Sequence, residues 1–353
     1  MVITVEKMKE ILLGLTRAEL KDLMEELGEK EYRAGQVAGW IYHSGIKEID
    51  HMRNLPVEFR QRLAERYEVG RSTIEKISRS DDRAFKLLLG LSDGALVESV
   101  GMPYADRFSC CVSTQVGCAM ACLFCATGSG GFKRNLAAGE IIDQVLSVQE
   151  TAMREKLLTG GQDRVSHVVF MGMGEPLLNY AVTLKAVALL NSELNIGMRS
   201  ITVSTIGYVP GIYKLAQEHL QLTLAVSLHA PDDELRRKLV PGMPRYSIKD
   251  IVGACKDYVK ETGRRVTFEY CLLKAVNDSD AAAQMLAALL KGINCHVNLI
   301  PFNSVTGSGF RRPGAERVTA FRRVLETQGI TVTQREQRGA GINAACGQLR
   351  RLT

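Results

Sequence analysis

The strongest constraint on the fold is a series of apolar segments, each followed by a helical pattern, that begins near residue 109. The expected strands are 110–115, 165–171, 200–205, 222–228, 266–273 and 296–302, and the expected helices are 138–155, 180–192, 210–219, 247–261, 279–291 and 314–328. Runs such as Val168-Val169-Phe170 are continuously apolar, which is typical of parallel strands buried on both faces. The pattern predicts an α/β protein with a partial (βα)6 barrel, whose active residues lie at the carboxyl ends of the strands.

The rest of the chain predicts three further regions. Residues 1–75 read as a small helical domain, in which Thr16 caps the first helix and no strand pattern occurs. Residues 76–104 read as a linker with a β-hairpin, 85–91 and 95–100, joined by the turn Ser92-Asp93-Gly94. The barrel is expected over 105–337, and 338–353 form a C-terminal tail.

Composition narrows the class of protein. The chain has 353 residues, of which 46% are hydrophobic and 24% charged, as in ordinary globular proteins. No stretch reaches the roughly 18 apolar residues of a membrane span, and the apolar run 11–15 is too short for a secretory signal. We therefore expect a cytoplasmic protein without a membrane partner.

Nine cysteines, an odd number, argue against a structural disulfide framework and favour metal binding or catalysis. One group falls within 16 residues, Cys346 lies near the C-terminus, and three others lie in apolar segments, where they read as small core residues. The clustered residues are Cys110, Cys111, Cys118, Cys122 and Cys125, and the scattered ones are Cys255, Cys271 and Cys295.

The spacing Cys118-xxx-Cys122-xx-Cys125, in a loop after the first barrel strand, allows three thiolates to converge on one centre. A tetrahedral zinc site needs a fourth ligand, and the next histidine along the chain is His167. A 4Fe–4S cluster tolerates three cysteines and leaves one iron open. The spacing favours the cluster, with zinc as the alternative.

Positive charge is concentrated at the C-terminal end. Residues 311–353 contain nine arginines and three glutamates, so this stretch carries the whole net charge of +6. Arginine binds phosphate oxygens in pairs, which suits contact with nucleic acid. The same charges fit a solvent-exposed helix face equally well.

Several motifs together resemble the RlmN-type RNA methyltransferases of the radical S-adenosylmethionine superfamily, over essentially the whole chain. The segments are the cysteine triplet with Ala126-Thr127-Gly128, Cys111-Val112-Ser113-Thr114-Gln115-Val116-Gly117-Cys118, Met171-Gly172-Met173-Gly174-Glu175-Pro176-Leu177, Ser227-Leu228-His229 and Ala344-Ala345-Cys346-Gly347-Gln348-Leu349. The resemblance implies a TIM-like radical S-adenosylmethionine barrel that methylates C2 of an adenosine in the peptidyl transferase centre of 23S rRNA, and of adenosine 37 in some tRNAs. It also implies an RNA-binding role for the helical domain.

The resemblance further implies a 4Fe–4S cluster held by Cys118, Cys122 and Cys125, and two S-adenosylmethionine molecules per turnover. Cys346 carries the methyl group as S-methylcysteine, and its carbon joins the RNA in a transient adduct. Cys111 resolves that adduct through a transient disulfide with Cys346, and Glu98 accepts the C2 proton. Read alone, Glu98 is an ordinary surface carboxylate and Cys346 an ordinary free thiol.

The remaining implied contacts are to S-adenosylmethionine. They fall at the ends of expected strands, on Gly174, Glu175, Ser204, Ser227, Leu228, His229 and Asn303. Without the resemblance, the Gly-x-Gly-Glu segment reads as a tight turn and His229 as a capping histidine. The family also implies a low-potential electron donor such as flavodoxin, and we expect a monomer.

Two other functions compete with this one. A Cfr-type relative uses the same residues to methylate C8 of the same rRNA adenosine, but Pro176 and Pro301-Phe302-Asn303 favour the C2 type. A non-enzymatic metal-cluster RNA-binding protein would leave Cys346 without a role. The chain also departs from the family pattern, since Asn343 replaces a common Asp and Cys110 adds a thiol beside Cys111.

Overall fold

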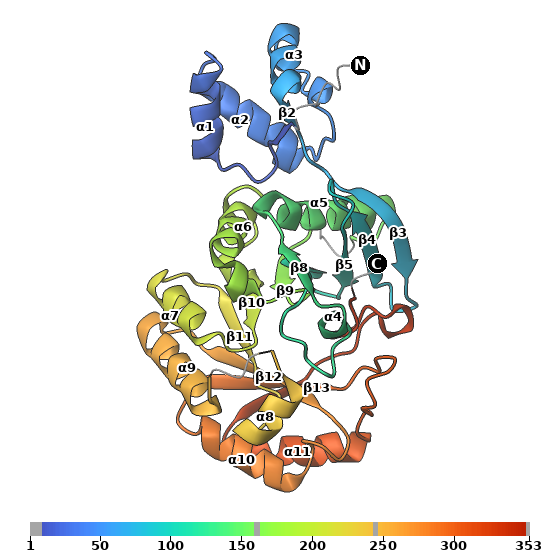
Figure 1. The fold of residues 1–353 in the computed structure, drawn as a ribbon, viewed down its shortest axis with the longest axis vertical. Helices are drawn as coiled ribbons and strands as arrows, with labels where there is room; N and C mark the ends of the chain where they lie inside the picture. Colours follow the sequence, from blue (N-terminus) through green and yellow to red (C-terminus); the bar gives the residue numbers. More distant parts are fainter. Residues whose placement is uncertain (1–8, 159–162, 243–245, 351–353) are drawn as a thin grey trace, which may run out of the picture.

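The structure is a computed structural model that describes residues 9–158, 163–242 and 246–350 (Figure 1). The first eight residues of the expected helical domain lie outside the described residues, as do the last three of the expected tail, including Arg351. In Figure 1 the N-terminal helices form a lobe at one end of the molecule, and one extended segment after β2 leads from this lobe into the larger body.

The N-terminal unit is helical, as predicted. Its helices are α1 (Arg17–Glu26), α2 (Tyr32–Ala38), the π-helix η1 (Gly39–His43), the 3-10 helix η2 (Ile49–His51) and α3 (Val57–Arg66). Thr16 and Glu19 form a capping box, in which the Thr16 side chain accepts from Glu19 N at 3.2 Å and Glu19 accepts from Thr16 N at 2.7 Å. The predicted absence of strands is wrong, because β1 (Glu10–Ile11) pairs in parallel with β2 (Tyr67–Glu68). Strands of two residues leave no pattern in the sequence.

The N-terminal unit packs closely on the first long helix of the barrel, α5 (Ala138–Arg154). A Cβ atom on Gly14 would lie 2.5 Å from Gly139 N, so the two segments of the chain need glycine where they cross. Arg17 pairs with Glu193 at 3.0 Å, and Arg71 forms a buried ion pair with Asp143. Main-chain packing and buried charge therefore join the two parts.

One ten-stranded sheet forms the centre of the molecule, in the order β14-β13-β12-β11-β10-β9-β6-β5-β4-β3. From β6 to β14 all neighbours are parallel, whereas β3 to β6 are antiparallel. The parallel strands are β6 (Phe108–Cys111), β9 (His167–Phe170), β10 (Ile201–Thr205), β11 (Thr223–Ser227), β12 (Val266–Leu272), β13 (Cys295–Pro301) and β14 (Thr331–Gln334). The first six confirm the predicted (βα)6 partial barrel, and β14 adds a seventh parallel strand.

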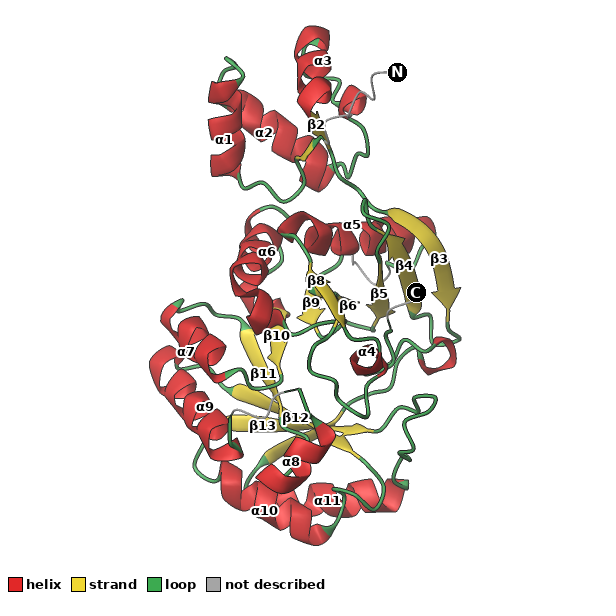
Figure 2. Cartoon of the chain, viewed as in Figure 1, coloured by secondary structure: helices red, strands yellow, loops and turns green. Residues whose placement is uncertain are grey.

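Helices cover the outer side of the parallel strands (Figure 2). They are α5, α6 (Tyr180–Ser192), α7 (Val209–Gln217), α9 (Ile248–Thr262), α10 (Asp280–Leu290) and α11 (Ala315–Thr327), and each lies within two residues of its predicted bounds. Two shorter helices, α4 (Ala126–Ser129) and α8 (Asp233–Leu239), were not predicted. None of the helices in the described part of the chain combines the length and apolarity needed to cross a membrane.

The predicted hairpin is present as β4 (Phe85–Gly90) and β5 (Leu96–Pro103), and it continues the barrel sheet because β5 pairs with β6. A further edge strand, β3 (Thr73–Arg79), was missed because its sequence, TIEKISR, is largely polar. A second small hairpin joins β7 (Gln115–Gly117) to β8 (Phe132–Asn135).

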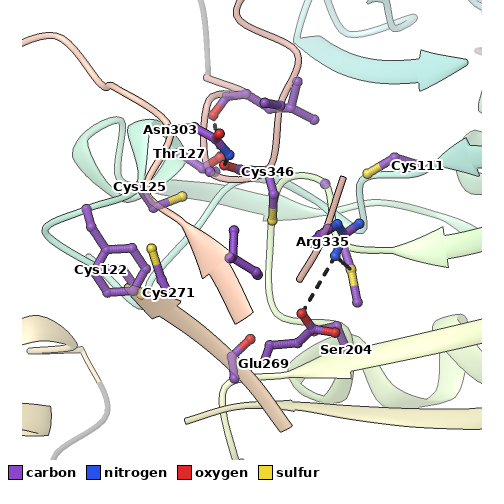
Figure 3. A pocket seen from close by; sticks show the side chains of 18 of the residues that line it. Cys111, Cys122, Cys125, Thr127, Ser204, Glu269, Cys271, Asn303, Arg335 and Cys346 are labelled. Carbon is purple, nitrogen blue, oxygen red and sulfur yellow. Dashed lines mark hydrogen bonds and ion pairs between the residues drawn. The ribbon is translucent and has the colours of Figure 1, made fainter. Parts of the chain in front are cut away.

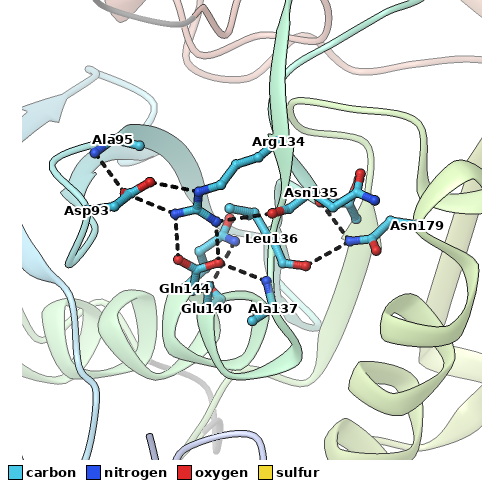
Figure 4. Close-up of polar contacts among 10 residues, drawn as sticks. Asp93, Ala95, Arg134, Asn135, Leu136, Ala137, Glu140, Gln144 and Asn179 are labelled. Carbon is cyan, nitrogen blue, oxygen red and sulfur yellow. Dashed lines mark hydrogen bonds and ion pairs between the residues drawn. The ribbon is translucent and has the colours of Figure 1, made fainter. Parts of the chain in front are cut away.

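Arg134 in β8 ties the two hairpins to α5 (Figure 4). Its guanidinium donates to both carboxylate oxygens of Asp93, at 2.8 and 3.0 Å, and to both oxygens of Glu140, at 2.9 Å each. These bonds lower the pKa of Asp93 to about 2, chiefly through the Arg134 hydrogen bond. The β4–β5 turn, β8 and the first turn of α5 are thereby fixed together beside the cysteine loop.

Candidate active site

One cavity opens at the carboxyl ends of the parallel strands, and cysteines from four parts of the chain line it: Cys111, the triplet, Cys271 and Cys346 (Figure 3). Cys111 ends β6, the triplet follows β7, and Cys346 comes from the C-terminal tail. The predicted site residues that line the cavity are Cys111, Cys118, Cys122, Cys125, Gly174, Glu175, Ser204, Ser227, His229, Asn303 and Cys346. The strand ends thus gather residues that lie up to 235 positions apart in sequence.

The cysteine triplet sits in a short loop with its own backbone bonds. Cys125 N donates to Cys122 O at 3.1 Å, and Ala121 takes a left-handed conformation, φ 51°, that turns the chain between the thiols. Apolar side chains, including Met120 and Phe124, pack around the three sulfurs. Burial raises the pKa of Cys118 to about 12 and also raises that of Cys122 well above its ordinary value, so a positively charged centre is needed to hold these thiols as thiolates.

The three thiols fit an iron–sulfur cluster in number, exposure to one cavity and apolar surroundings. Within the described ranges, no three Cys, His, Asp or Glu side chains close on the position of a single metal ion. All nine cysteines are free thiols.

Gly174 and Glu175 follow β9 and face the cysteine loop. A Cβ atom on Gly174, whose φ is +107°, would lie 2.7 Å from Gln115, so glycine is required where this turn meets β7. The Glu175 carboxylate accepts from Leu177 N at 3.0 Å and from Ile206 N at 2.7 Å. Burial raises its pKa to about 7, and a ligand cation in the cavity would lower that value and keep the carboxylate ionised.

Asn303 and His229 differ in how their polar atoms are used. Asn303 Nδ2 donates to the Cys346 carbonyl oxygen at 3.0 Å, while its Oδ1 is buried with no partner in the described part of the chain and remains available to a ligand. His229 Nδ1 accepts from Cys271 N at 3.0 Å, and burial lowers its pKa to about 3. A neutral ring with Nδ1 accepting carries its proton on Nε2, so His229 offers one donor.

Hydrogen bonds from the residues after Cys346 hold the tail beside the cysteine loop. Ala126 N donates to Gly347 O at 2.7 Å, and Gln348 Nε2 donates to Ser304 O at 2.8 Å. Asn343, the departure from the family pattern, has φ 52°, a left-handed conformation that Asn adopts more readily than most residues. Its carbonyl accepts from Lys86 Nζ at 3.0 Å.

Two expected site residues do not line the cavity. Leu228 is fully buried, and its amide donates to Glu269 O at 3.0 Å. Glu98 is buried in β5, where its carboxylate accepts from Lys86 Nζ at 2.8 Å and from Arg350 N at 2.8 Å. Glu98 therefore contacts the tail that carries Cys346.

Cys110 and Cys111 point to opposite faces of β6, because successive side chains alternate along a strand. Cys111 lines the cavity, whereas Cys110 is fully buried, 3.7 Å from Ser99 Oγ. The extra thiol is therefore kept away from Cys346.

Among the cavity residues that the sequence analysis did not assign to the site are Cys271, Glu269 and Arg335. Cys271 was read as a core residue, yet it ends β12 and lines the cavity as well as being buried. Glu269, also in β12, is 4% exposed, and Arg335 lies 3.8 Å from it. The sequence did offer one signal for this pair: a glutamate, Glu269, lies inside the apolar run 266–273. A charge that is buried there needs a partner of opposite charge.

Comparison with known proteins identifies the family of this chain. Residues 11–69 match the family described as the ribosomal RNA large subunit methyltransferase N-terminal domain, and residues 112–286 match the radical SAM superfamily. Probable dual-specificity RNA methyltransferases RlmN from Rippkaea orientalis and Thermosynechococcus vestitus are 48% and 47% identical, over 97% and 96% of this chain and 98% of each relative.

A solved structure extends the likeness to the whole fold. The crystal structure of a radical SAM methyltransferase from Sphaerobacter thermophilus superimposes with a TM-score of 0.91, at 46% identity, over 96% of this chain and 98% of that one. Identity near one half over nearly the full length of each chain shows common descent. The chain belongs to the RlmN family of radical S-adenosylmethionine RNA methyltransferases.

Proposed function

We propose that this protein methylates C2 of an adenosine in 23S rRNA and in some tRNAs, through an S-methylcysteine at Cys346. One observation carries the proposal: Cys111 and Cys346, 235 residues apart, line the same cavity as the cysteine triplet. A second thiol beside the methyl carrier is useful only if a covalent adduct on Cys346 must be resolved.

The substrate atom explains why a radical enzyme is needed. C2 of adenine lies between two ring nitrogens and is electron-poor, so it does not attack a methyl sulfonium. A 4Fe–4S cluster on Cys118, Cys122 and Cys125, with S-adenosylmethionine bound, supplies a hydrogen-abstracting radical. Glu175, with Asn303 Oδ1 and the His229 Nε2 proton, faces the cavity as the polar set for that ligand.

The two remote cysteines act in sequence. The Cys346 thiolate accepts a methyl group from one S-adenosylmethionine, and a second molecule is spent to activate that methyl carbon. After the carbon joins C2, the adduct gives up one electron and the C2 proton. The Cys111 thiolate then attacks the Cys346 sulfur and a disulfide forms, while the electron pair of the broken sulfur–carbon bond passes to the methyl carbon, which takes up a proton. An external two-electron reduction returns both thiols, and low-potential electrons come from a donor such as flavodoxin.

We assign proton acceptance from C2 to Glu98. Its carboxylate is bound by Lys86 and by Arg350 N, so a shift of the tail on RNA binding would release one of its two partners. We assign the holding of RNA to residues 1–75 together with the arginine-rich C-terminal region, and place the reaction in the cytoplasm with the protein as a monomer.

The roles of the two cysteines are tested with single variants of the anaerobic holoenzyme and an rRNA fragment. Cys111→Ala is expected to accept the methyl group, join the RNA and stop, so that a protein–RNA adduct accumulates on denaturing gels. Cys346→Ala is expected to form no adduct, and Cys110→Ala serves as the matched control with normal turnover. Turnover of Cys111→Ala at the rate of the unaltered protein would refute the resolving role.

The position of methylation is read from the product. Mass spectrometry of digested RNA separates 2-methyladenosine from 8-methyladenosine, and only the first is expected. The 8-methyl product would assign the chain to the Cfr-type reaction.

A further inference from the structure

Arg335 places a positive charge beside the two remote cysteines, and the reaction proposed above leaves it without a role. It follows β14, and its amide donates to Leu299 O at 2.8 Å. Nη1 donates to Met171 Sδ at 3.0 Å and lies 3.8 Å from Glu269 Oε2. Figure 3 shows the guanidinium between Cys111 and Cys346, with Glu269 on its other side.

The position of Arg335 matters because both sulfurs are buried. Burial raises the pKa of Cys111 to about 12 and also raises that of Cys346, which disfavours the thiolates that the chemistry needs. The Arg335 charge lowers the pKa of both thiols. The other charged or titratable groups that act on them, Cys346 on Cys111 and Glu269 with Cys125 on Cys346, raise it.

We propose that Arg335 is a positioning residue, the shared counter-charge that stabilises first the Cys346 thiolate and then the Cys111 thiolate, with Glu269 and Met171 fixing its guanidinium. The inference rests on the proposed roles of these cysteines. One cation cannot fully neutralise two adjacent anions. Methylation turns the Cys346 thiolate into a neutral thioether, which leaves the Arg335 charge to Cys111 when the resolving thiolate is required.

The test measures thiolate formation without RNA. Anaerobic holoenzyme is alkylated with iodoacetamide across a pH series, and peptide mass spectrometry follows Cys111 and the unmethylated fraction of Cys346. Arg335→Gln is expected to slow alkylation of Cys111 by about tenfold at neutral pH, which corresponds to about one pKa unit. Arg335→Lys keeps the charge and should stay within a few-fold of the unaltered protein.

The matched control is Arg322→Gln, the same substitution on the outer helix α11, where Arg322 pairs with Glu326 at 2.6 Å. It should leave the alkylation profile unchanged. Equal profiles for Arg335→Gln and the unaltered protein, or a Lys variant as slow as the Gln variant, would overturn the inference. Iron content and circular dichroism establish that each variant is folded.

Sharing of the charge is tested with Cys346→Ser, a neutral replacement of similar size. It should speed alkylation of Cys111, and the gain should vanish in the double variant Cys346→Ser/Arg335→Gln. No gain in the single variant contradicts a shared counter-charge. Because RNA takes no part in these measurements, a failure of RNA methylation would leave their outcome intact, and the two failures are distinguishable.

Discussion

Single residues in the cavity owe their chemistry to their surroundings more than to their type. His229 takes a left-handed φ of 60° at the end of β11, and its ring stands edge-on to Phe124 with centroids 4.8 Å apart. Burial keeps this imidazole neutral and therefore a single donor, whereas an exposed histidine would titrate near neutral pH. The same burial makes the thiols of the cavity dependent on a nearby cation.

The first prediction concerns the cluster ligands. Replacing Cys118, Cys122 or Cys125 with Ala should abolish both iron binding and reductive cleavage of S-adenosylmethionine, because only three thiols serve the centre. Iron analysis of anaerobically reconstituted protein gives the measurement, and Cys255→Ala, a buried thiol outside the cavity, is the control. Full iron retention in a triple variant would exclude this ligand set.

The second prediction concerns Asp93, whose pKa is lowered to about 2 from 3.8 by Arg134. A lowered pKa means that the folded state favours the carboxylate, so the stabilisation is complete above about pH 4 and is lost as pH falls through about 2. Near neutral pH, the free energy of unfolding in urea should therefore be lower for Asp93→Asn than for the unaltered protein. This difference should shrink on acidification. In an Arg134→Gln background that pH-dependent difference should disappear, and its persistence would argue against the pairing.

At the scale of elements, α5 connects the N-terminal unit to the barrel. Asp143 on its buried face pairs with Arg71, and the two side chains are only 2% and 3% exposed. Asp143 also accepts from Ser72 N at 2.8 Å. Because these groups come from the segment that links the two parts, the pair fixes how that segment meets the helix.

The third prediction is that Asp143→Ala lowers the free energy of unfolding by about 3 kcal/mol, since it removes the buried carboxylate beside Arg71 and leaves that guanidinium with Gly45 O at 2.6 Å and the more exposed Glu150 at 3.4 Å. The measurement is the first urea transition followed by circular dichroism. Glu155→Ala breaks a pair with Arg79, which is 58% exposed, and should cost much less because water screens the exposed charges. Similar losses in the two variants would show that burial does not set the strength of these pairs.

At the scale of the whole molecule, several arginines of the C-terminal region are already bound to other groups of the protein. Arg312 donates to Gln337 Oε1 at 3.0 Å, Arg338 pairs with Glu336 at 2.7 Å and Arg335 faces Glu269. Arg311 and Arg323 are exposed and remain the better candidates for phosphate contact.

The fourth prediction follows from that difference. If Arg311 and Arg323 contact RNA phosphates, each change to Gln should reduce the slope of log K against log salt by about 0.7 to 0.9. Filter binding of an rRNA fragment over a salt series measures the slope. Arg312→Gln removes a guanidinium already bound within the protein and should change the slope less. Equal slopes for Arg311→Gln, Arg323→Gln and the unaltered protein would move RNA contact elsewhere.

Several features were readable from the sequence because they depend on short-range patterns. The βα succession follows from local periodicity, and the helices of the barrel begin and end close to the predicted residues. The cysteine triplet has its spacing in one loop, and the residues at strand ends, such as Glu175 and Asn303, share one edge of a parallel sheet by topology alone.

Only the tertiary structure decided which distant groups meet. Strands as short as β1 and β2 form because another segment lies beside them, and no local pattern encodes that. The sequence reads Cys271 as a core residue, whereas the fold places it at the cavity, and only the fold shows that Glu98 binds Lys86 and the tail that carries Cys346. Arg335 and Glu269 are 66 residues apart, and packing alone brings their charges to the two cysteines, because contact between distant residues is set by the fold and not by spacing.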